Sequence, residues 1–276
     1  MKRAFYLIRH NPALYVSGLM IALFVMAAMV APLISPFDPL AINLNIVKQA
    51  PGPVHLFGTD TLGRDIFSRV VFGARTSLLI GLSATALSLL LGLIAGMLAG
   101  YIGGAADTCI TIITDIFLAF PSLLLAIGIS VLLPPGLLSV TLALCLVGWA
   151  SFARLFRAMT ISLKERSFVE AARAMGCSHL RIMAWHLLPH CLPIVMIAAT
   201  IKVGGFILAE SALSFLGLGI QPPEPTWGGM ISLNRNYLPS APWMIFFPGI
   251  AIALTVFAFN IFGDCLRDKL DPNMRL

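Results

Sequence analysis

Three ionisable residues stand inside long apolar stretches of this sequence and are the first candidates for function. They are Asp115, Lys202 and Glu210. An unpaired charge in an apolar interior is costly, so such residues usually find a partner or line a polar path. Asp115 and Glu210 lie near the ends of their stretches, whereas Lys202 is central. We expect Lys202 to face a wet path or to pair with a carboxylate, and we favour pairing or extension of its ammonium group to water.

His186 and His190 are four residues apart, a spacing that could present two imidazole rings to a metal ion from one helix face. Pro189 lies between them and is expected to disrupt the turn. Cys191 is the one nearby residue that could extend the set. We interpret the pair as polar residues of a surface loop and predict no metal site.

A nucleotide-binding loop is absent. The sequence contains no Gly-x-x-x-x-Gly-Lys-Ser/Thr and no Gly-Lys dipeptide at all. In such a loop, backbone N–H groups and the lysine bind the phosphates of ATP. We therefore predict that the chain has no catalytic residues and no cofactor of its own.

Composition indicates which elements must position these residues. Hydrophobic residues make up 59% of the 276 residues, and charged residues only 11%. Soluble domains carry about 25% charged residues, and the mean hydropathy here is +0.94. The chain cannot cover a soluble surface with so few charges. It is therefore predicted to be an all-α integral membrane protein.

Six membrane spans are expected, because a helix needs about 20 mostly apolar residues to cross the hydrocarbon core. One uncharged run, from Ile116 to Ala153, would be about 57 Å long as a single helix. We divide it at Pro134-Pro135-Gly136. The six expected spans cover 14–35, 76–106, 108–133, 137–157, 191–211 and 242–263.

Lysine and arginine favour the cytoplasmic side of a membrane. If the N-terminus is inside, the inner segments hold twelve of them and the outer loops five, which with Lys202 accounts for all 18. Both termini are thus expected in the cytoplasm. The expected organisation is a cytoplasmic segment 1–13, a first transmembrane helix 14–35, an outer loop 36–75, a transmembrane core 76–264 containing the cytoplasmic loop 158–190, and a cytoplasmic tail 265–276.

The end of the outer loop, from Leu62 to Arg75, predicts an amphipathic helix lying at the membrane interface. Asp65 and Arg69 are expected to pair at i,i+4 on its polar face. The span that follows has glycine at every fourth position, which strips one helix face of side chains and favours close packing against another helix. These helix-packing residues are Gly92, Gly96 and Gly100.

The inner loop, about 158–190, predicts a short helix, a break and a second short helix. Gly176 stands where the first helix would stop, and Ser178 could cap the second. One interpretation of Glu170 needs no other protein, because Ser167-x-x-Glu170 fits a capping box. The other interpretation is a docking element for a partner protein.

The spacing of a Glu-Ala-Ala triplet, a glycine and a Leu-Pro pair in this loop resembles the EAA loop of ABC importer permeases. His186 stands where the general motif has isoleucine, although a similar histidine ending occurs in the oligopeptide and dipeptide branch. The resemblance implies a cytoplasmic coupling helix that docks on an ATP-hydrolysing subunit. The matching residues are Glu170, Ala171, Ala172, Gly176, His186, Leu188 and Pro189.

Further stretches, in the same order, resemble the C-type permease of dipeptide, oligopeptide and nickel importers over nearly the whole chain. One of them begins at Glu210, in the fifth span, and reaches Gly219. A second runs from Gln221 to Gly228, and another ends at Pro272. The most compact is an outer-loop signature that contains Gly58, Thr59, Asp60, Gly63, Arg64 and Asp65.

This resemblance implies a permease subunit in the bacterial inner membrane that forms half of a pathway for small peptides. The implied partners are a homologous permease, two ATP-binding subunits that hold ATP and magnesium, an outer solute-binding protein and membrane lipid, with no nucleic acid. Import of nickel or a metal chelate is an alternative within the same architecture. Two other classes are an ion-coupled secondary transporter, for which no internal repeat is visible, and a membrane metalloenzyme, which only the His186/His190 pair would support.

Overall fold

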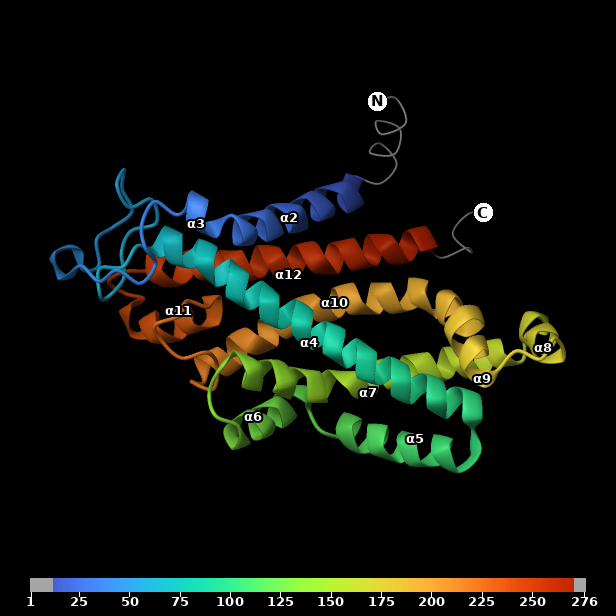
Figure 1. Cartoon of the computed structure of the whole chain (residues 1–276). Coiled ribbons are helices and arrows are strands. Elements are labelled where there is room, and N and C mark those ends of the chain that lie inside the picture. Colours follow the sequence, from blue (N-terminus) through green and yellow to red (C-terminus); the bar gives the residue numbers. More distant parts are fainter. Residues whose placement is uncertain (1–11, 271–276) are drawn as a thin grey trace, which may run out of the picture.

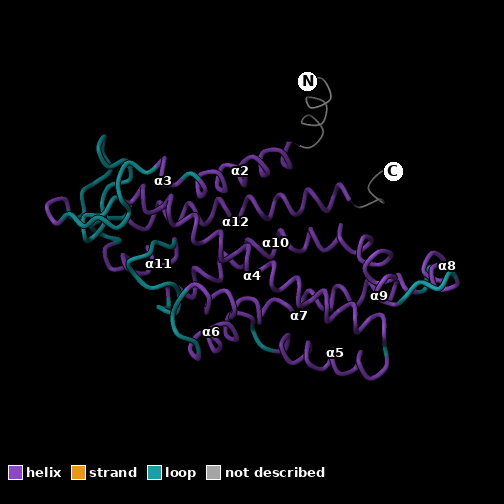
Figure 2. The backbone as a smooth tube through the Cα atoms, in the orientation of Figure 1, coloured by secondary structure: helices purple, strands orange, loops and turns teal. Residues whose placement is uncertain are grey.

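The chain is described by a computed structural model over residues 12–270, with side chains to residue 269 (Figure 1). Within that range there is no β-strand, and one isolated bridge joins Thr59 to Asp65 (Figure 2). Short 3-10 turns are η1 (Leu44–Ile46) and η3 (Arg235–Tyr237), and η2 (Ile182–Leu187) is a π-helix. The α-helices are α2 (Pro12–Met29), α3 (Ala31–Ile34), α4 (Ile66–Ile102), α5 (Gly104–Ala119), α6 (Ser122–Leu132), α7 (Leu137–Lys164), α8 (Ser167–Ala174), α9 (His179–Arg181), α10 (Leu188–Phe215), α11 (Trp227–Asn234) and α12 (Trp243–Leu270).

Five helical stretches of the described chain are long and apolar enough to cross a membrane. Four are α2, α4, α7 and α12, and the fifth is the continuous stretch His179–Phe215, in which α9, η2 and α10 follow one another without a break. A sixth span is complete only if α5 and α6 are taken together. The prediction of a helical membrane protein is therefore confirmed, and the number of spans is five or six.

The span expected at 108–133 is bent in the middle. Helices α5 and α6 meet at an angle of 94°. Phe120, the residue at the bend, has an extended backbone with φ −89° and ψ 142°. It precedes Pro121, and proline disfavours helical backbone in the residue before it. The bend is thus explained by Pro121, which the sequence analysis left inside a straight span.

Helices α4 and α7 lie side by side along much of their length (Figure 1). The three spaced glycines of α4 form this contact. A Cβ atom on Gly92 would lie 2.4 Å from Cβ of Phe152, and one on Gly96 would lie 2.3 Å from the carbonyl oxygen of Ala153. Gly100 faces the next turn of α7, at Arg157. Because backbone atoms of α7 fill the space, no larger residue fits at the first two positions without separating the helices.

The predicted interfacial helix at 62–75 is wrong as a separate element. Helix α4 begins at Ile66 and runs unbroken for 37 residues, about 55 Å against a hydrocarbon core of about 30 Å. Asp65 caps it by accepting a hydrogen bond from the Ser68 N–H, and Arg69 is buried rather than solvated. The segment from Ile66 to Arg75 and the apolar span that follows it therefore form one continuous helix.

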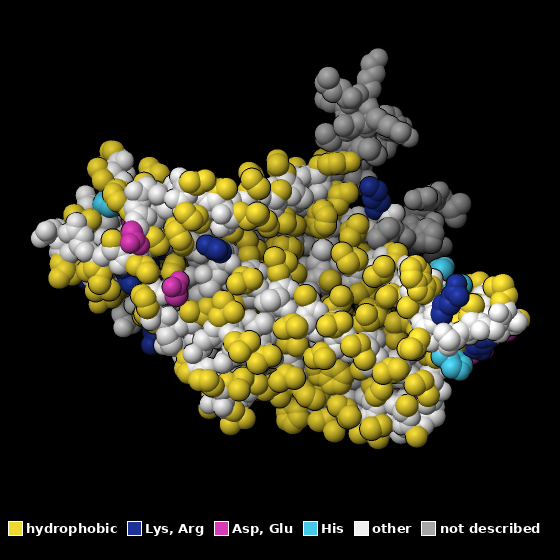
Figure 3. All heavy atoms as spheres, viewed as in Figure 1, with side chains coloured by type: hydrophobic (Ala, Val, Ile, Leu, Met, Phe, Trp, Pro, Cys, Tyr) yellow, Lys and Arg dark blue, Asp and Glu magenta, His cyan; other side chains and the backbone are white. Residues whose placement is uncertain are grey.

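The two ends of the molecule differ in content (Figure 1). The loop end contains residues 35–65 and 216–242, which include α11. The α8 end contains residues 165–187. Hydrophobic side chains cover most of the flank between them, whereas Lys, Arg and His gather at the α8 end (Figure 3). The predicted terminal segments lie largely outside the described residues: of 1–13 only 12 and 13 are described, in α2, and of 265–276 only 265–270, in the last turns of α12.

Candidate functional site

Helix α8 presents one face to the core and the other to solvent. Val169 and Ala172 are fully buried and join an apolar cluster with Phe156 and Leu187. Glu170, between them in sequence, is exposed. No side chain caps α8 at its N-cap residue, Arg166, so the capping-box interpretation of Ser167 and Glu170 is wrong. Among the described residues, the exposed Glu170 carboxylate makes no hydrogen bond or ion pair.

The break after α8 has the geometry of a Schellman motif. The Cys177 N–H donates to the Ala172 carbonyl at 3.0 Å, and the Gly176 N–H donates to the Arg173 carbonyl at 2.9 Å. Gly176 has a φ of +78°, in the left-handed region that favours glycine. A Cβ atom here would meet nothing within 4 Å. The residue is therefore required by backbone conformation and not by lack of space.

The second helix of this segment is not short, because it continues into α10. Ser178 caps α9, accepting a hydrogen bond from the Arg181 N–H at 3.4 Å. The backbone then widens into the π-helix η2, where the Leu188 N–H donates to the Met183 carbonyl. Pro189 follows at the start of α10. Proline lacks an N–H and its ring clashes with the carbonyl four residues earlier, so the wider turn accommodates it.

The two histidines do not present their rings as a pair. Nδ1 of His190 lies 2.8 Å from the backbone carbonyl oxygen of His186, and the His190 ring stacks on Phe168 of α8 at 4.9 Å between centroids. No group of three metal-ligating side chains occurs between residues 12 and 269. The His190 ring thus contacts η2 and α8, and His186 contributes its backbone carbonyl.

Large apolar side chains are exposed at the same end. Met175 and Leu180 are 74% exposed and Trp185 is 76% exposed. Glu170, Arg173 and Arg181 of the same end are also exposed. Figure 3 shows the basic and histidine side chains gathered here. Exposed apolar groups rimmed by charges are typical of a protein-binding surface.

This surface also contacts the end of α4. The Tyr101 hydroxyl lies 3.0 Å from Nδ1 of His179, and the Arg173 guanidinium lies over the Tyr101 ring at 5.6 Å from its centroid. One end of the longest helix is therefore joined to both short helices of the α8 end.

Asp115 pairs with Arg154 of α7, with 2.7 Å between Oδ1 and Nη2. The side chains are 56% and 59% exposed, so the pair lies at the surface of this chain. Two turns earlier in α5, Asp107 accepts two hydrogen bonds from Arg157, one of them 2.7 Å from Nη2 to Oδ2. A cavity of about 310 Å³ is lined by Asp115, Arg154 and Arg157. Sequence reasoning missed Asp107 because it falls at a span boundary.

Glu210 is fully buried and has hydroxyl partners instead of a cation. Ser214 donates to its carboxylate at 2.7 Å, and Ser77 and Ser211 lie at 3.5 Å. Ser77 in turn accepts from the Trp227 N–H at 3.4 Å. The carboxylate thus joins α4, α10 and the start of α11. It is buried inside the chain and does not reach its surface.

Lys202 has no carboxylate partner among the described residues. Its ammonium nitrogen lies 5.4 Å from the centroid of the Phe206 ring, and its side chain lines a cavity between α6, α7 and α10. Of the expected arrangements, pairing is wrong for this chain. The residue faces a cavity.

The outer-loop signature builds a rigid frame at the loop end. Nε of Arg64 donates to Asp60 at 2.7 Å, and Nε of Arg69 lies 3.8 Å from the same carboxylate oxygen. Asp65 bonds His55 at 2.8 Å, and all of these side chains are buried. Sequence reasoning did not connect His55 to this frame, since it lies ten residues from its partner.

The remaining signature residues shape the backbone of the frame. Gly58 and Gly63 have φ values of +77° and +70°. A Cβ atom on Gly63 would lie 1.8 Å from the Asn43 carbonyl oxygen. The Thr59 hydroxyl accepts from the Gln49 N–H at 2.8 Å and donates to the Ile46 carbonyl. The signature residues therefore stabilise the outer loop through contacts within that loop.

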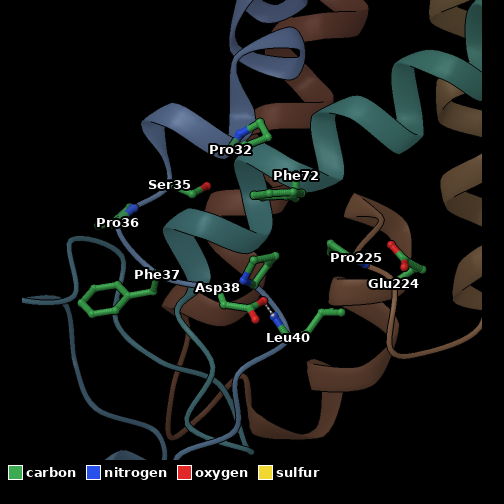
Figure 4. Close-up of a pocket in the computed structure, with 10 residues that line it drawn as sticks. Pro32, Ser35, Pro36, Phe37, Asp38, Leu40, Phe72, Glu224 and Pro225 are labelled. Atoms are coloured by element: carbon green, nitrogen blue, oxygen red, sulfur yellow. Dashed lines mark hydrogen bonds between the residues drawn. The ribbon is translucent and has the colours of Figure 1, made fainter.

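Beside this frame lies a pocket of about 430 Å³ (Figure 4). Its walls are mostly apolar, with Phe72 of α4 and several prolines. Asp38 and Glu224 approach it from two different loops. The Asp38 carboxylate is engaged locally, accepting from the Leu40 N–H at 2.8 Å.

Two solved structures share the fold of this chain. The chain is similar to a structure titled as inward-facing conformations of the MetNI methionine ABC transporter, with a TM-score of 0.59, 21% identity, and coverage of 74% of this chain and 97% of that one. A crystal structure of an amino acid ABC transporter with histidines gives a TM-score of 0.51 at 17% identity, over 73% and 92% of the two chains. The fold is that of an ABC transporter membrane subunit.

Sequence comparison then identifies the family. The chain belongs to the family described as binding-protein-dependent transport system inner membrane component, whose model matches residues 92–276. Residues 1–51 match the N-terminal TM domain of oligopeptide transport permease C. The chain is thus a multi-pass membrane component of a binding-protein-dependent transport system.

Three curated relatives are similar over nearly their whole length. A dipeptide transport system permease protein DppC of Alkalihalophilus pseudofirmus is 43% identical over 99% of this chain and 90% of that protein. The oligopeptide permease OppC of Bacillus subtilis is 39% identical over the same shares. A glutathione transport system permease, GsiD of Escherichia coli, is 42% identical over 94% and 86%.

Proposed function

We propose that this chain is the C-type permease subunit of an ATP-driven importer and forms half of the pathway for small peptides. The observation that carries this proposal is 43% identity over 99% of the chain to a dipeptide permease. The oligopeptide permease relative and the match of residues 1–51 point the same way.

The α8 end is the surface that would couple transport to ATP hydrolysis on separate subunits. Glu170, Ala171 and Gly176 belong to a segment whose exposed face carries apolar and basic groups, and Glu170 has no partner within the described chain. His186, Leu188 and Pro189 lie where this segment joins α10 and set its direction. Ala172 faces the core and anchors it.

The remaining partners follow from the proposed architecture. A second, homologous permease would complete the pathway, two ATP-binding subunits would hold ATP and magnesium, and a solute-binding protein would deliver cargo at the loop end. In a bacterial inner membrane, the α8 end and both termini would be cytoplasmic. This orientation puts twelve Lys and Arg residues on the inner side and five on the outer side, as the preference of basic residues for the cytoplasm favours. Single cysteines at positions 61 and 177 should then react with an impermeant thiol reagent from opposite sides.

The charged residues of the spans would have different roles. Asp115 and Arg154 are exposed on this chain and are placed to meet the pathway or the second permease. Glu210 is buried among hydroxyl groups and supports the framework instead. Lys202 faces a cavity and is the strongest candidate for contact with cargo.

Glutathione is a second candidate cargo, because one relative at 42% identity is a glutathione permease. It is also a peptide, so one site could serve both. Nickel or a metal chelate and an ion-coupled transporter remain the competing functions.

Uptake into proteoliposomes tests the proposal. The chain is reconstituted with its permease, ATPase and binding-protein partners, and labelled dipeptide, glutathione and nickel are compared. Dipeptide uptake is expected to require ATP and the binding protein. Uptake of nickel alone, or uptake driven by an ion gradient in the absence of ATP, would overturn it. An ATPase subunit lacking its nucleotide-binding lysine serves as the control.

A further inference from the structure

A small pocket lies between α6, α7 and α10, and it opens at the surface of this chain, where Leu123 and Gly205 are exposed. Its volume is about 160 Å³. Most of its wall is apolar, and two of its lining side chains are polar, Ser122 at the start of α6 and Lys202 of α10. The apolar lining residues are Leu123, Ala126, Leu144, Val147, Gly205, Phe206 and Ala209.

Lys202 is placed too deep to reach either end of its helix. It lies 14 residues after Leu188 and 13 before Phe215, about 20 Å along the axis from each end. A lysine side chain cannot span that distance. Its ammonium group instead lies over Phe206, at 5.4 Å from the ring centroid. A ring of this kind stabilises a cation only weakly, so the charge still lacks a counter-ion within the described chain.

The other polar edge of the cavity is the start of α6. Pro121 is its N-cap residue and provides no side-chain cap. The first intrahelical bond runs from the Leu125 N–H to the Pro121 carbonyl at 3.0 Å. The N–H groups of residues 122–124 therefore point out of the helix, and they carry the partial positive charge of a helix N-terminus. This end exists only because the span is broken at Pro121.

The carboxylates of α5 and α10 already have partners. Asp115 is paired with Arg154, and Asp107 with Arg157. Glu210, two turns further along α10, is surrounded by serine hydroxyls. The pocket thus brings Lys202 of α10 together with Ser122 and Leu123 of the α6 N-terminus, and no acidic group of the described chain pairs with Lys202.

We propose that this cavity is an anion-binding subsite of the pathway, in which Lys202 binds the carboxylate of a transported peptide. A free peptide carries such a carboxylate whatever its side chains, so one fixed cation suits cargo of varied sequence. Ser122 and the α6 N–H groups complete the set of donors. The inference rests on the proposed function, because it takes the cargo to be a peptide.

Transport by Lys202 variants is the first test. The complete importer is reconstituted with wild-type chain, Lys202→Met, Lys202→Arg and the control Leu208→Met, which changes an exposed residue of α10 outside the cavity. Lys202→Met should lower dipeptide uptake by about tenfold or more, as expected for loss of a charged hydrogen bond. Lys202→Arg should retain most of the uptake, and ATPase stimulation by the loaded binding protein should persist in all variants.

The outcomes separate the two proposals. If wild-type importer takes up no dipeptide, the proposed function fails. If wild-type uptake is normal and Lys202→Met matches it, only the subsite fails. Loss of uptake together with loss of complex assembly would assign Lys202 to packing against the second permease, and would also overturn the subsite.

Chemical labelling of the wild-type complex tests the ligand directly and needs no variant. A small amine-reactive imidate modifies accessible lysines, and mass spectrometry follows Lys202, with Lys164 at the end of α7 as the internal control. Dialanine should slow modification of Lys202 alone, and dialanine amide should not. Equal protection by the amide or by acetate at the same concentration, or no protection by dialanine, would overturn the assignment.

Discussion

The loop end and the α8 end use charged residues in opposite ways. At the loop end, Asp60, Arg64 and Arg69 are buried and satisfy one another. At the α8 end, Glu170 and Arg173 are exposed, and the Glu170 carboxylate has no partner within the described chain. Both sets belong to motifs that looked equally functional in the sequence. One set is paired inside the chain, and the other is exposed at its surface.

The largest effect is expected at the centre of the buried frame. Asp60→Ala would leave two guanidinium groups buried without their carboxylate, at a cost of about 3–5 kcal/mol. Thermal unfolding in detergent and the yield of folded protein measure it. Asp38→Ala is the matched control, because Asp38 is an exposed loop carboxylate near the same end. Equal stability of both variants would mean that the frame contributes nothing.

Two glycines with the same backbone conformation sharpen the comparison. Gly63 and Gly176 have φ values of +70° and +78°, and a Cβ atom at each costs about 1–2 kcal/mol for the left-handed conformation alone. Gly63→Ala should cost considerably more, because its Cβ would also overlap the Asn43 carbonyl. Urea unfolding of the two variants compares the free energies, and Gly176→Ala equal to or worse than Gly63→Ala would contradict the prediction.

The smallest effect on stability is expected at Glu170. Glu170→Ala removes an exposed side chain without a partner, so the free energy of unfolding should change by about 0.5 kcal/mol at most. Co-purification of the ATPase subunits and ATP-dependent uptake should nevertheless fall. Glu165→Ala, at an exposed carboxylate five residues earlier, is the control that should keep both. Normal uptake with Glu170→Ala would remove the α8 end from the coupling step.

The sequence predicted the apolar helices well, because the bilayer requires long uncharged runs and these are visible residue by residue. It predicted the break at Gly176 because glycine itself marks the end of a helix. The bend at Pro121 was missed, since a run of uncharged residues hides a change of direction. The contacts of Asp107 and Gly96 could not be predicted, because each depends on which helix lies opposite. Likewise, the burial of Arg69 could not be predicted, because its contacts with Pro39 and Asp60 depend on the fold of the preceding loop.

Helix α4 has a mechanical consequence. One end is clamped in the buried frame through Asp65 and Arg69, and the other touches both short helices of the α8 end through Tyr101. As an unbroken rod of about 55 Å, it acts as a lever, so a tilt of about 5° at one end moves the other by about 5 Å. A small displacement of the α8 end would therefore reach the loop end without any bending of α4 in between.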